Sequence, residues 1–240
     1  TCNISSTGFA NYNVGPQGSV ASNGNVIVDF NANYITGTRS HGINFFGNAN
    51  PPFPTKSIQG KVRNNVVGTQ GVTNSGSNLG PALRIQNEGA LPITLLIQNN
   101  TFQEMQNFQG INVNVGLSGI ATGGLATNLT ILTNTIRDAR GSRAITIQDN
   151  QSSPNTPAPT VCVDMSGNAF TNIVGQAGDG SFVRLRELNG VMSVRQVAPT
   201  TAANAGELDD VNGGNDVTGT RYNISGTPQF GQAACAQPPN

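Results

Sequence analysis

The sequence of 240 residues contains no tryptophan, three tyrosines and a single histidine. Charged residues account for only 10% of the chain, and their formal charges sum to zero. A nucleic-acid-binding protein is expected to carry a basic excess, so the composition argues against nucleic acid as a partner. No apolar run approaches the roughly eighteen residues that a bilayer span requires, so we expect no membrane span. The scarcity of tryptophan and tyrosine also removes the aromatic platforms on which sugars usually stack.

An asparagine-centred motif recurs along the chain, and the segment "IQNNTF" at 97–102 is one copy. In every copy an asparagine stands two residues before an apolar residue. The copies are centred on Asn33, Asn65, Asn100, Asn134 and Asn168. Successive asparagines are 32, 35, 34 and 34 residues apart, which is a regular period. A fixed period in this range is typical of repeat architectures.

The segment before each asparagine alternates between apolar and polar residues, as expected for a half-buried strand. Of the fifteen positions that lie three, five and seven residues before these asparagines, thirteen are apolar, and the exceptions are Gly60 and Thr127. A second alternating segment follows each motif, for example Ile111 and Val113 after Asn100. Each repeat therefore predicts a strand, an asparagine corner, a short strand and another strand.

A unit of this kind cannot bury its own apolar face, so it must stack on copies of itself. The sequence thus predicts an all-β fold, a parallel β-helix or β-solenoid of about six coils with about 34 residues per coil. Equivalent residues of successive coils would lie about 4.8 Å apart. The asparagines would then form an internal ladder, in which stacked side chains satisfy one another's polar groups.

The corners "NNVV", "NNTF" and "GNAF" and their period resemble the right-handed parallel β-helix proteins, the pectin-lyase-like superfamily, over roughly residues 20–190. Many secreted bacterial surface proteins are built in the same way. The resemblance implies a right-handed coil. It does not imply one function, because this architecture carries lyases, hydrolases, tailspikes and adhesins alike.

The repeat weakens at both ends of the chain. We expect residues 1–18 to form an N-terminal cap or an imperfect first coil, and residues 19–197 to form the regular coils. Residues 198–240 would contain an insertion loop, a final irregular coil around Asn215 and a C-terminal tail. The chain begins "TCNISS", without Met or a signal peptide, so we expect a processed or excised piece.

Residues that could perform chemistry are few, and no catalytic residue is predicted. Asp29 and Asp164 fall at equivalent outward positions four coils apart, about 19 Å, which is too far to share a metal. Glu104 and Asp138 each follow a ladder asparagine by four residues, so they should stack on successive coils. They are weak candidates for a cation site, and the alternative is a solvated charge cluster with the nearby arginines.

One further pair of acidic residues leaves the same choice between a cation site and a solvated charge cluster. Asp149 and Glu187 form a second candidate stack beside Arg186. His41 in "SHG" is expected to be an outward or loop residue next to the strand that contains Ile43. Outward positions such as Thr130 should tolerate a charged substitution. No cofactor is expected.

The three cysteines are Cys2, Cys162 and Cys235, and an odd number suggests one free or intermolecular thiol. Monotonic stacking would separate Cys2 from Cys235 by about 24 Å, which is too far for a bond within one chain. Either Cys235 bonds Cys2 of the next copy in an end-to-end stack, or the tail folds back and Cys235 bonds Cys162.

The function predicted from these features is that of a secreted structural or adhesive β-solenoid, a surface-protein or fibre subunit that associates end to end into a filament. Its location would be extracellular or at the cell surface. The alternative is a polysaccharide-active enzyme or a spike that binds surface glycans in a cleft formed by loops 47–56, 68–80 and 148–160.

Overall fold

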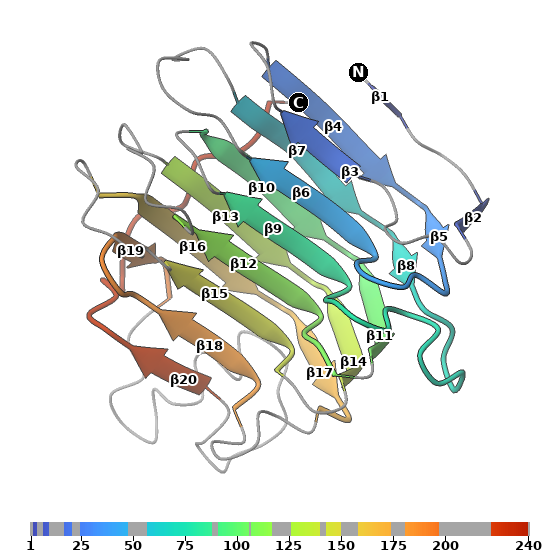
Figure 1. Cartoon of the computed structure of the whole chain (residues 1–240). Helices are drawn as coiled ribbons and strands as arrows, with labels where there is room; N and C mark the ends of the chain where they lie inside the picture. The colour runs from blue at the N-terminus through green and yellow to red at the C-terminus, as the bar shows by residue number, and fades with distance from the viewer. Residues whose placement is uncertain are drawn as a thin grey trace.

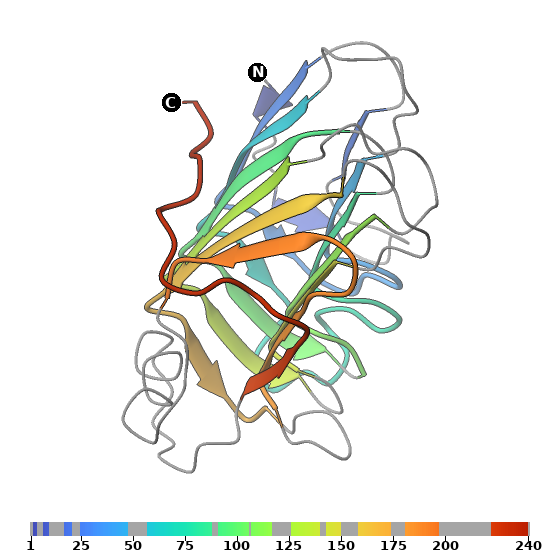
Figure 2. The same ribbon diagram turned by 90° about the vertical axis from the view of Figure 1, so that its left-hand side faces the viewer.

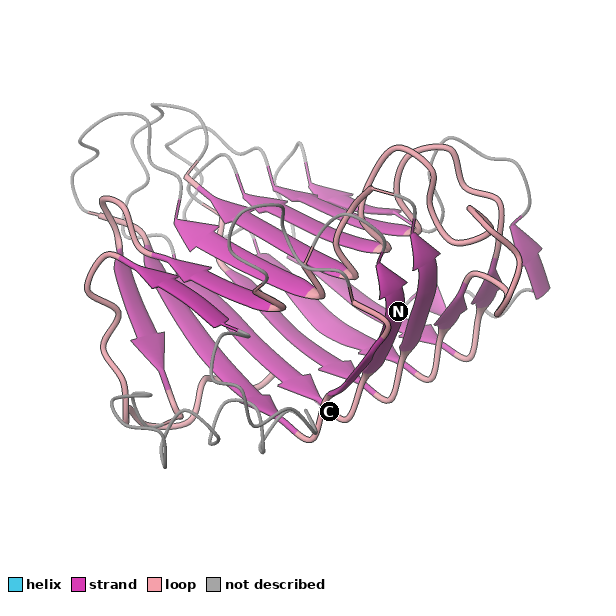
Figure 3. Cartoon of the chain, turned by 90° about the horizontal axis from the view of Figure 1, so that it is seen from below, coloured by secondary structure: helices cyan, strands magenta, loops and turns pink. Residues whose placement is uncertain are grey.

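The structure is a computed structural model. Its described part contains β-strands and no helix (Figure 3). Side chains are described from residue 25 onward. The described residues are 2–3, 7–9, 17–20, 25–47, 57–87, 91–105, 107–116, 126–139, 143–149, 158–173, 181–196 and 222–239.

The strands form three sheets (Figure 1). In spatial order, the first sheet contains β1 (Cys2–Asn3), β4 (Asn25–Asn31), β7 (Ser57–Arg63), β10 (Ile93–Gln98), β13 (Ala126–Leu132), β16 (Thr160–Ser166) and β19 (Val191–Val194). The second sheet contains β2 (Thr7–Phe9), β5 (Tyr34–Ile35), β8 (Val66–Val67), β11 (Thr101–Met105), β14 (Thr135–Ala139) and β17 (Ala169–Thr171). The third sheet contains β3 (Gln17–Val20), β6 (Ile43–Gly47), β9 (Leu83–Asn87), β12 (Ile111–Val115), β15 (Ile145–Asp149), β18 (Val183–Arg186) and β20 (Tyr222–Ser225).

The chain passes from the first sheet to the second and then to the third, and it repeats this path coil after coil. Every named pair of neighbouring strands is parallel, and the register follows the repeat, with Ile97 opposite Ile131 and Val113 opposite Ile147. The predicted parallel β-solenoid with a spacing of about 34 residues is therefore confirmed. The coil count differs slightly from the expected six. Five coils, β4 to β18, have all three strands with described side chains, β1–β3 precede them, and β19 and β20 follow.

The interior is a single apolar core, because the alternating residues of all three sheets point inward. The predicted inward residues of the first and third sheets are buried, apart from Val26 near the N-terminal end, which is half-buried. The two exceptions to the apolar pattern have local reasons. A Cβ atom at Gly60 would lie 2.1 Å from the carbonyl oxygen of Val28, so only glycine fits there. The buried Thr127 hydroxyl lies 3.4 Å from Asn87 Nδ2, which donates to it.

Each sharp corner between the first and second sheets combines a left-handed residue with a ladder asparagine. The residue before each asparagine has a positive φ, between 52° and 62°. These residues are Ala32, Asn64, Asn99, Thr133 and Gly167. The asparagine then turns its amide into the stack, where it is almost fully buried.

The asparagine ladder is continuous through the five described coils. The Nδ2 atoms of Asn33, Asn65, Asn100 and Asn134 each donate to the Oδ1 atom of the next asparagine, at 2.8–2.9 Å. The main-chain N–H of each of these residues donates to the same Oδ1 atom, at 3.0 Å. Because both donors and both acceptor lone pairs of a mid-stack asparagine are used, the buried amide carries no unmet polar group. The sixth expected member, Asn215, lies outside the described residues.

The C-terminal segment folds back over the outside of the solenoid (Figure 2). After β20 it runs beside β19, where Gln229 forms a parallel bridge with Ser193, and it then crosses the outer face of the first sheet. Of the two cysteine pairings considered from the sequence, the structure contains the bond between Cys162 and Cys235 within one chain, with a Cα–Cα distance of 5.6 Å.

Candidate functional site

The outer face of the third sheet carries the most regular set of polar side chains. One residue from each of six successive strands points outward at equivalent register, and together we name them the third-sheet polar row. The row contains Asn44, Arg84, Asn112, Thr146, Arg184 and Asn223. Adjacent members are separated by one strand spacing, about 4.8 Å.

Two members of the polar row, Asn44 and Thr146, carry buried oxygen atoms without a hydrogen-bond partner among the described residues. Asn44 and Thr146 are only 6% and 3% exposed. The two atoms are Asn44 Oδ1 and Thr146 Oγ1. Beside this row, Gln148 donates to Asn114, and Asn114 Nδ2 donates to Asn112 Oδ1 of the polar row at 2.5 Å. Amide, hydroxyl and guanidinium groups in this arrangement can bind hydroxyl-rich ligands, but the row lacks the paired carboxylates used in glycoside hydrolysis.

His41 stands at one end of this face, next to Arg84, with 3.3 Å between His41 Nε2 and Arg84 Nη1. Burial, and then the positive charge of Arg84, lower the pKa of His41 to about 4. The ring is therefore neutral at neutral pH. Because a guanidinium has only donors, Nε2 must accept and the proton lies on Nδ1. The expectation that His41 lies outward beside the Ile43 strand agrees with this position, although the ring is half-buried.

Glu104 and Asp138 lie on neighbouring strands of the second sheet, between residue pairs that are in register. Both have positive φ angles, 58° and 56°. Glu104 Oε1 accepts a hydrogen bond from Gly71 N at 2.8 Å, and Asp138 Oδ1 accepts one from Asn172 Nδ2 at 3.2 Å. Each carboxylate is therefore bonded to a neighbouring coil.

The alternative of a solvated charge cluster is wrong for two of its members. Glu104 is 2% exposed and Arg143 is 4% exposed, and Arg143 Nε donates to Ser181 Oγ at 2.7 Å. Arg137 Nε donates to Gln103 Oε1 at 2.6 Å. Glu104, Arg137 and Arg143 therefore form hydrogen bonds between coils. The described residues contain no group of three or more His, Cys, Asp or Glu side chains that could hold a metal ion.

The remaining acidic candidates also have structural partners. Asp29 pairs with Arg63 through two hydrogen bonds, which raise the pKa of Arg63. Asp164 Oδ2 accepts a hydrogen bond from Arg195 Nη1 at 3.0 Å. Asp164 lies four strands away from Asp29 in the first sheet.

Asp149 is the last residue of β15, and Glu187 directly follows β18, the next strand of the third sheet. Asp149 is fully buried and faces Gly190, where a Cβ atom would lie 1.9 Å from Asp149 Oδ2. Glu187 accepts from Met192 N and Thr227 Oγ1, each at 2.8 Å.

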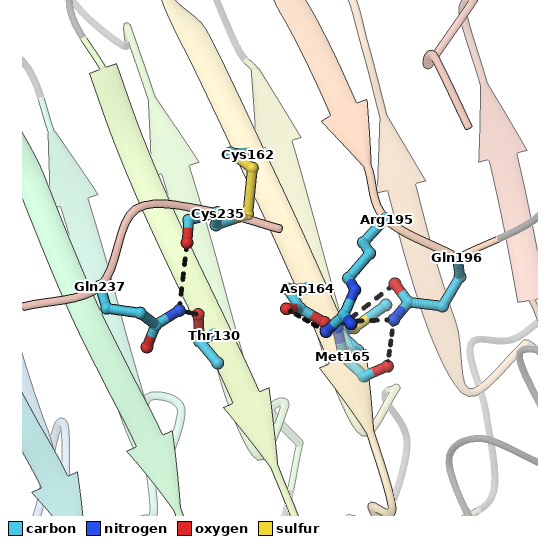
Figure 4. The surroundings of a disulfide bond; sticks show 8 residues. All are labelled: Thr130, Cys162, Asp164, Met165, Arg195, Gln196, Cys235 and Gln237. Carbon is cyan, nitrogen blue, oxygen red and sulfur yellow. Dashed lines mark hydrogen bonds and ion pairs between the residues drawn. A yellow bond between two sulfur atoms is a disulfide. The ribbon is translucent and has the colours of Figure 1, made fainter. Parts of the chain in front are cut away.

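The surroundings of the disulfide show how the C-terminal segment meets the first sheet (Figure 4). Gln237 Nε2 donates to Thr130 Oγ1 at 2.6 Å, one strand away from Cys162. Thr130 is therefore outward, as predicted, but only 3% exposed, so a charged substitution there would place its charge beneath the C-terminal segment and not in solvent. A cavity of about 300 Å³ lies between this segment and the sheet, next to the disulfide and Asn128.

Sequence reasoning missed the residues that fasten this segment, namely Gln229, Gln237 and their partners. The only signal was the loss of alternation in "GTPQFGQAACAQPPN", together with its cysteine. Such a stretch indicates irregular structure without showing where the structure lies.

Comparison with known proteins found no match to this chain among protein-family models, curated proteins or solved structures. In the part of the chain that the structure describes, no helix has the length and hydropathy to cross a membrane. The fold is thus shown by the structure itself.

Proposed function

We propose that this chain is a rigid extracellular β-solenoid, a structural or adhesive module of a surface protein or fibre of the same general kind as the secreted pectin-lyase-like repeat proteins. The observation that carries this proposal is the unbroken apolar core and asparagine ladder through all five described coils. Since every coil is bonded to both neighbours, the stack resists bending and extension along its axis.

The extracellular location is supported by the bond between Cys162 and Cys235. Disulfides form and persist in oxidising compartments and are rare in the reducing cytosol of most cells. The low charge and the polar, amide-rich surface are compatible with the same setting.

Fractionation of the source cells tests this location. After acid quenching and alkylation, Cys162 and Cys235 should be recovered as one disulfide-linked peptide pair, and protease added to intact cells should degrade the protein. A reduced pair in a protease-protected fraction would contradict the proposal.

The third-sheet polar row favours a second candidate function, the binding of surface glycans. Its amide and guanidinium groups repeat at the spacing of the coils, and Arg84 and Asn112 are partly exposed. A glycan array probed with the intact chain and with Arg84→Ala and Asn112→Ala tests this function. Binding that both substitutions weaken at least tenfold supports it, and an array without any bound glycan argues against it.

A further inference from the structure

Strand β19 ends the first sheet, and the side that faces away from β16 is already occupied. The main-chain N–H of Val194 donates to the carbonyl oxygen of Gln229 at 2.7 Å, and the N–H of Gln229 donates to the carbonyl oxygen of Met192 at 2.7 Å. The next carbonyl groups of β19 and its extension accept from the N–H groups of Gln232 and Gly231, at 3.1 and 2.9 Å. The C-terminal segment therefore takes the place that a further strand would occupy.

The start of this segment is fitted to its position. Glu187 links β19 to the C-terminal segment, because it accepts hydrogen bonds from Met192 N on β19 and from Thr227 Oγ1 on the segment. Gly226 has φ 87°, and a Cβ atom there would lie 2.2 Å from the carbonyl oxygen of Glu187. Only glycine allows the chain to turn so closely from β20 to the edge of β19.

The end of the segment is fastened away from that edge. Cys235 is bonded to Cys162 on β16, and Gln237 is bonded to Thr130 on β13 (Figure 4). Cys235 is 4% exposed and Pro238 is also buried. Residues 226–239, which we name the C-terminal strap, thus link β19 to two earlier strands of the first sheet.

We propose that the C-terminal strap is a detachable edge cap that keeps a second copy of this chain off β19, and that the Cys162–Cys235 bond holds it closed. Exposed strand edges pair readily with other chains unless they are covered. In a parallel sheet, one edge complements the opposite edge of an identical sheet, and β1 forms that opposite edge here. The inward residues Met192 and Val194 are already buried, so an added copy would extend the same core.

This inference goes beyond the proposed function, since it concerns the control of self-association. Release requires reduction of the disulfide, for which a dithiol suffices. One thiolate of the dithiol attacks one sulfur and forms a mixed disulfide, and its second thiolate then closes a cyclic disulfide. Cys162 and Cys235 each end with one proton, and the dithiol has supplied both electrons.

Sedimentation velocity of the whole chain over a range of concentrations tests the proposal. The released variant carries Cys162→Ser, Cys235→Ser and Gln229→Pro, where proline removes the N–H that bonds Met192. A matched blocked variant adds Val194→Pro. The Val194 N–H points to the strap and not to β16, so this proline leaves the β16–β19 ladder intact.

The released variant should self-associate with a Kd at least tenfold lower than that of the wild type, and the blocked variant should return to wild-type behaviour. The proposal is overturned if the released variant, with a wild-type circular dichroism spectrum, associates no more than the wild type. It is also overturned if the blocked variant associates as tightly as the released one.

If the released variant does not fold, amide hydrogen exchange on the wild-type chain tests whether the disulfide holds the strap on β19. Addition of a dithiol, with reduction verified by mass, should lower the protection of the Val194 and Gln229 amides at least tenfold. The amides of β13 should stay protected. Unchanged protection at Val194 and Gln229 after full reduction would show that the disulfide does not hold the strap and would reject the proposal.

Discussion

Replacement of Asn100 by alanine removes the centre of the asparagine ladder. Asn100 Oδ1 accepts from Asn65 N at 3.0 Å and from Asn65 Nδ2 at 2.9 Å. Asn100 Nδ2 donates to the carbonyl oxygen of Val62 at 2.8 Å and to Asn134 Oδ1 at 2.9 Å. Alanine keeps only the main-chain bond to Asn134 Oδ1. The substitution therefore breaks four hydrogen bonds in a part of the molecule that water does not reach.

Each of these bonds contributes about 1 kcal/mol net, so we expect the free energy of unfolding to fall by about 4 kcal/mol. Asn33 lies at the first described position of the ladder, and its Nδ2 atom donates to Asn65 Oδ1 and to the carbonyl oxygen of Asn31. Asn33→Ala breaks these two bonds, so we expect a loss of at least about 2 kcal/mol by the same reasoning.

Urea denaturation followed by circular dichroism measures both losses, and Asn107→Ala is the matched control because that side chain is exposed. The three substitutions delete the same atoms in three environments. Equal losses at Asn100, Asn33 and Asn107 would refute the ladder as a stabilising network.

Three further predictions concern other parts of the chain. Gly60→Ala places a Cβ atom 2.1 Å from a carbonyl oxygen and should lower the free energy of unfolding by about 3 kcal/mol in urea denaturation. The control Gly71→Ala meets no atom within 4 Å and should cost only about 1 kcal/mol for its positive φ, so similar losses would contradict the packing argument. The unfolded chain protonates His41 at a pKa of about 6.5 and the folded chain at about 4, so stability should fall as the pH drops through this range, and His41→Gln should lose this component of the profile. Cys162→Ser with Cys235→Ser should lower the free energy of unfolding in guanidinium chloride by about 4 kcal/mol, because the bond closes a loop with a sequence separation of 73, and an unchanged midpoint would count against the pairing.

The fold could be predicted from the sequence because its determinants repeat. Inward residues such as Leu95 and Ile97 alternate with outward ones in every coil, and a one-residue shift of register would expose them all. Asn100 stands out because a buried polar side chain needs a partner, and the period supplies one from the next coil. The exceptions at Gly60 and Thr127 required the structure, because they depend on one close approach and one hydrogen bond.

The candidate sites could be predicted less well because their determinants do not repeat. Glu104 and Asp138 lie within β11 and β14 but have a left-handed backbone, a conformation that the sequence pattern alone does not indicate for acidic residues. Thr130 looks like a solvent-exposed position until Gln237, 107 residues later, is seen to cover it. The path of the C-terminal strap depends on contacts at long sequence separation, which hydrophobic periodicity does not predict.

The central claim, that this chain is a rigid stack of coils, is tested most directly by single-molecule force spectroscopy with the two ends of the chain as handles. Before any unfolding event the tether should show no compliance beyond that of the handles, because every coil is bonded to its neighbours. Reduction should lengthen the fully unfolded chain by about 250 Å, the extended length of the residues between Cys162 and Cys235, whose sequence separation is 73. Gradual extension at low force, without discrete unfolding events, would contradict the rigid stack.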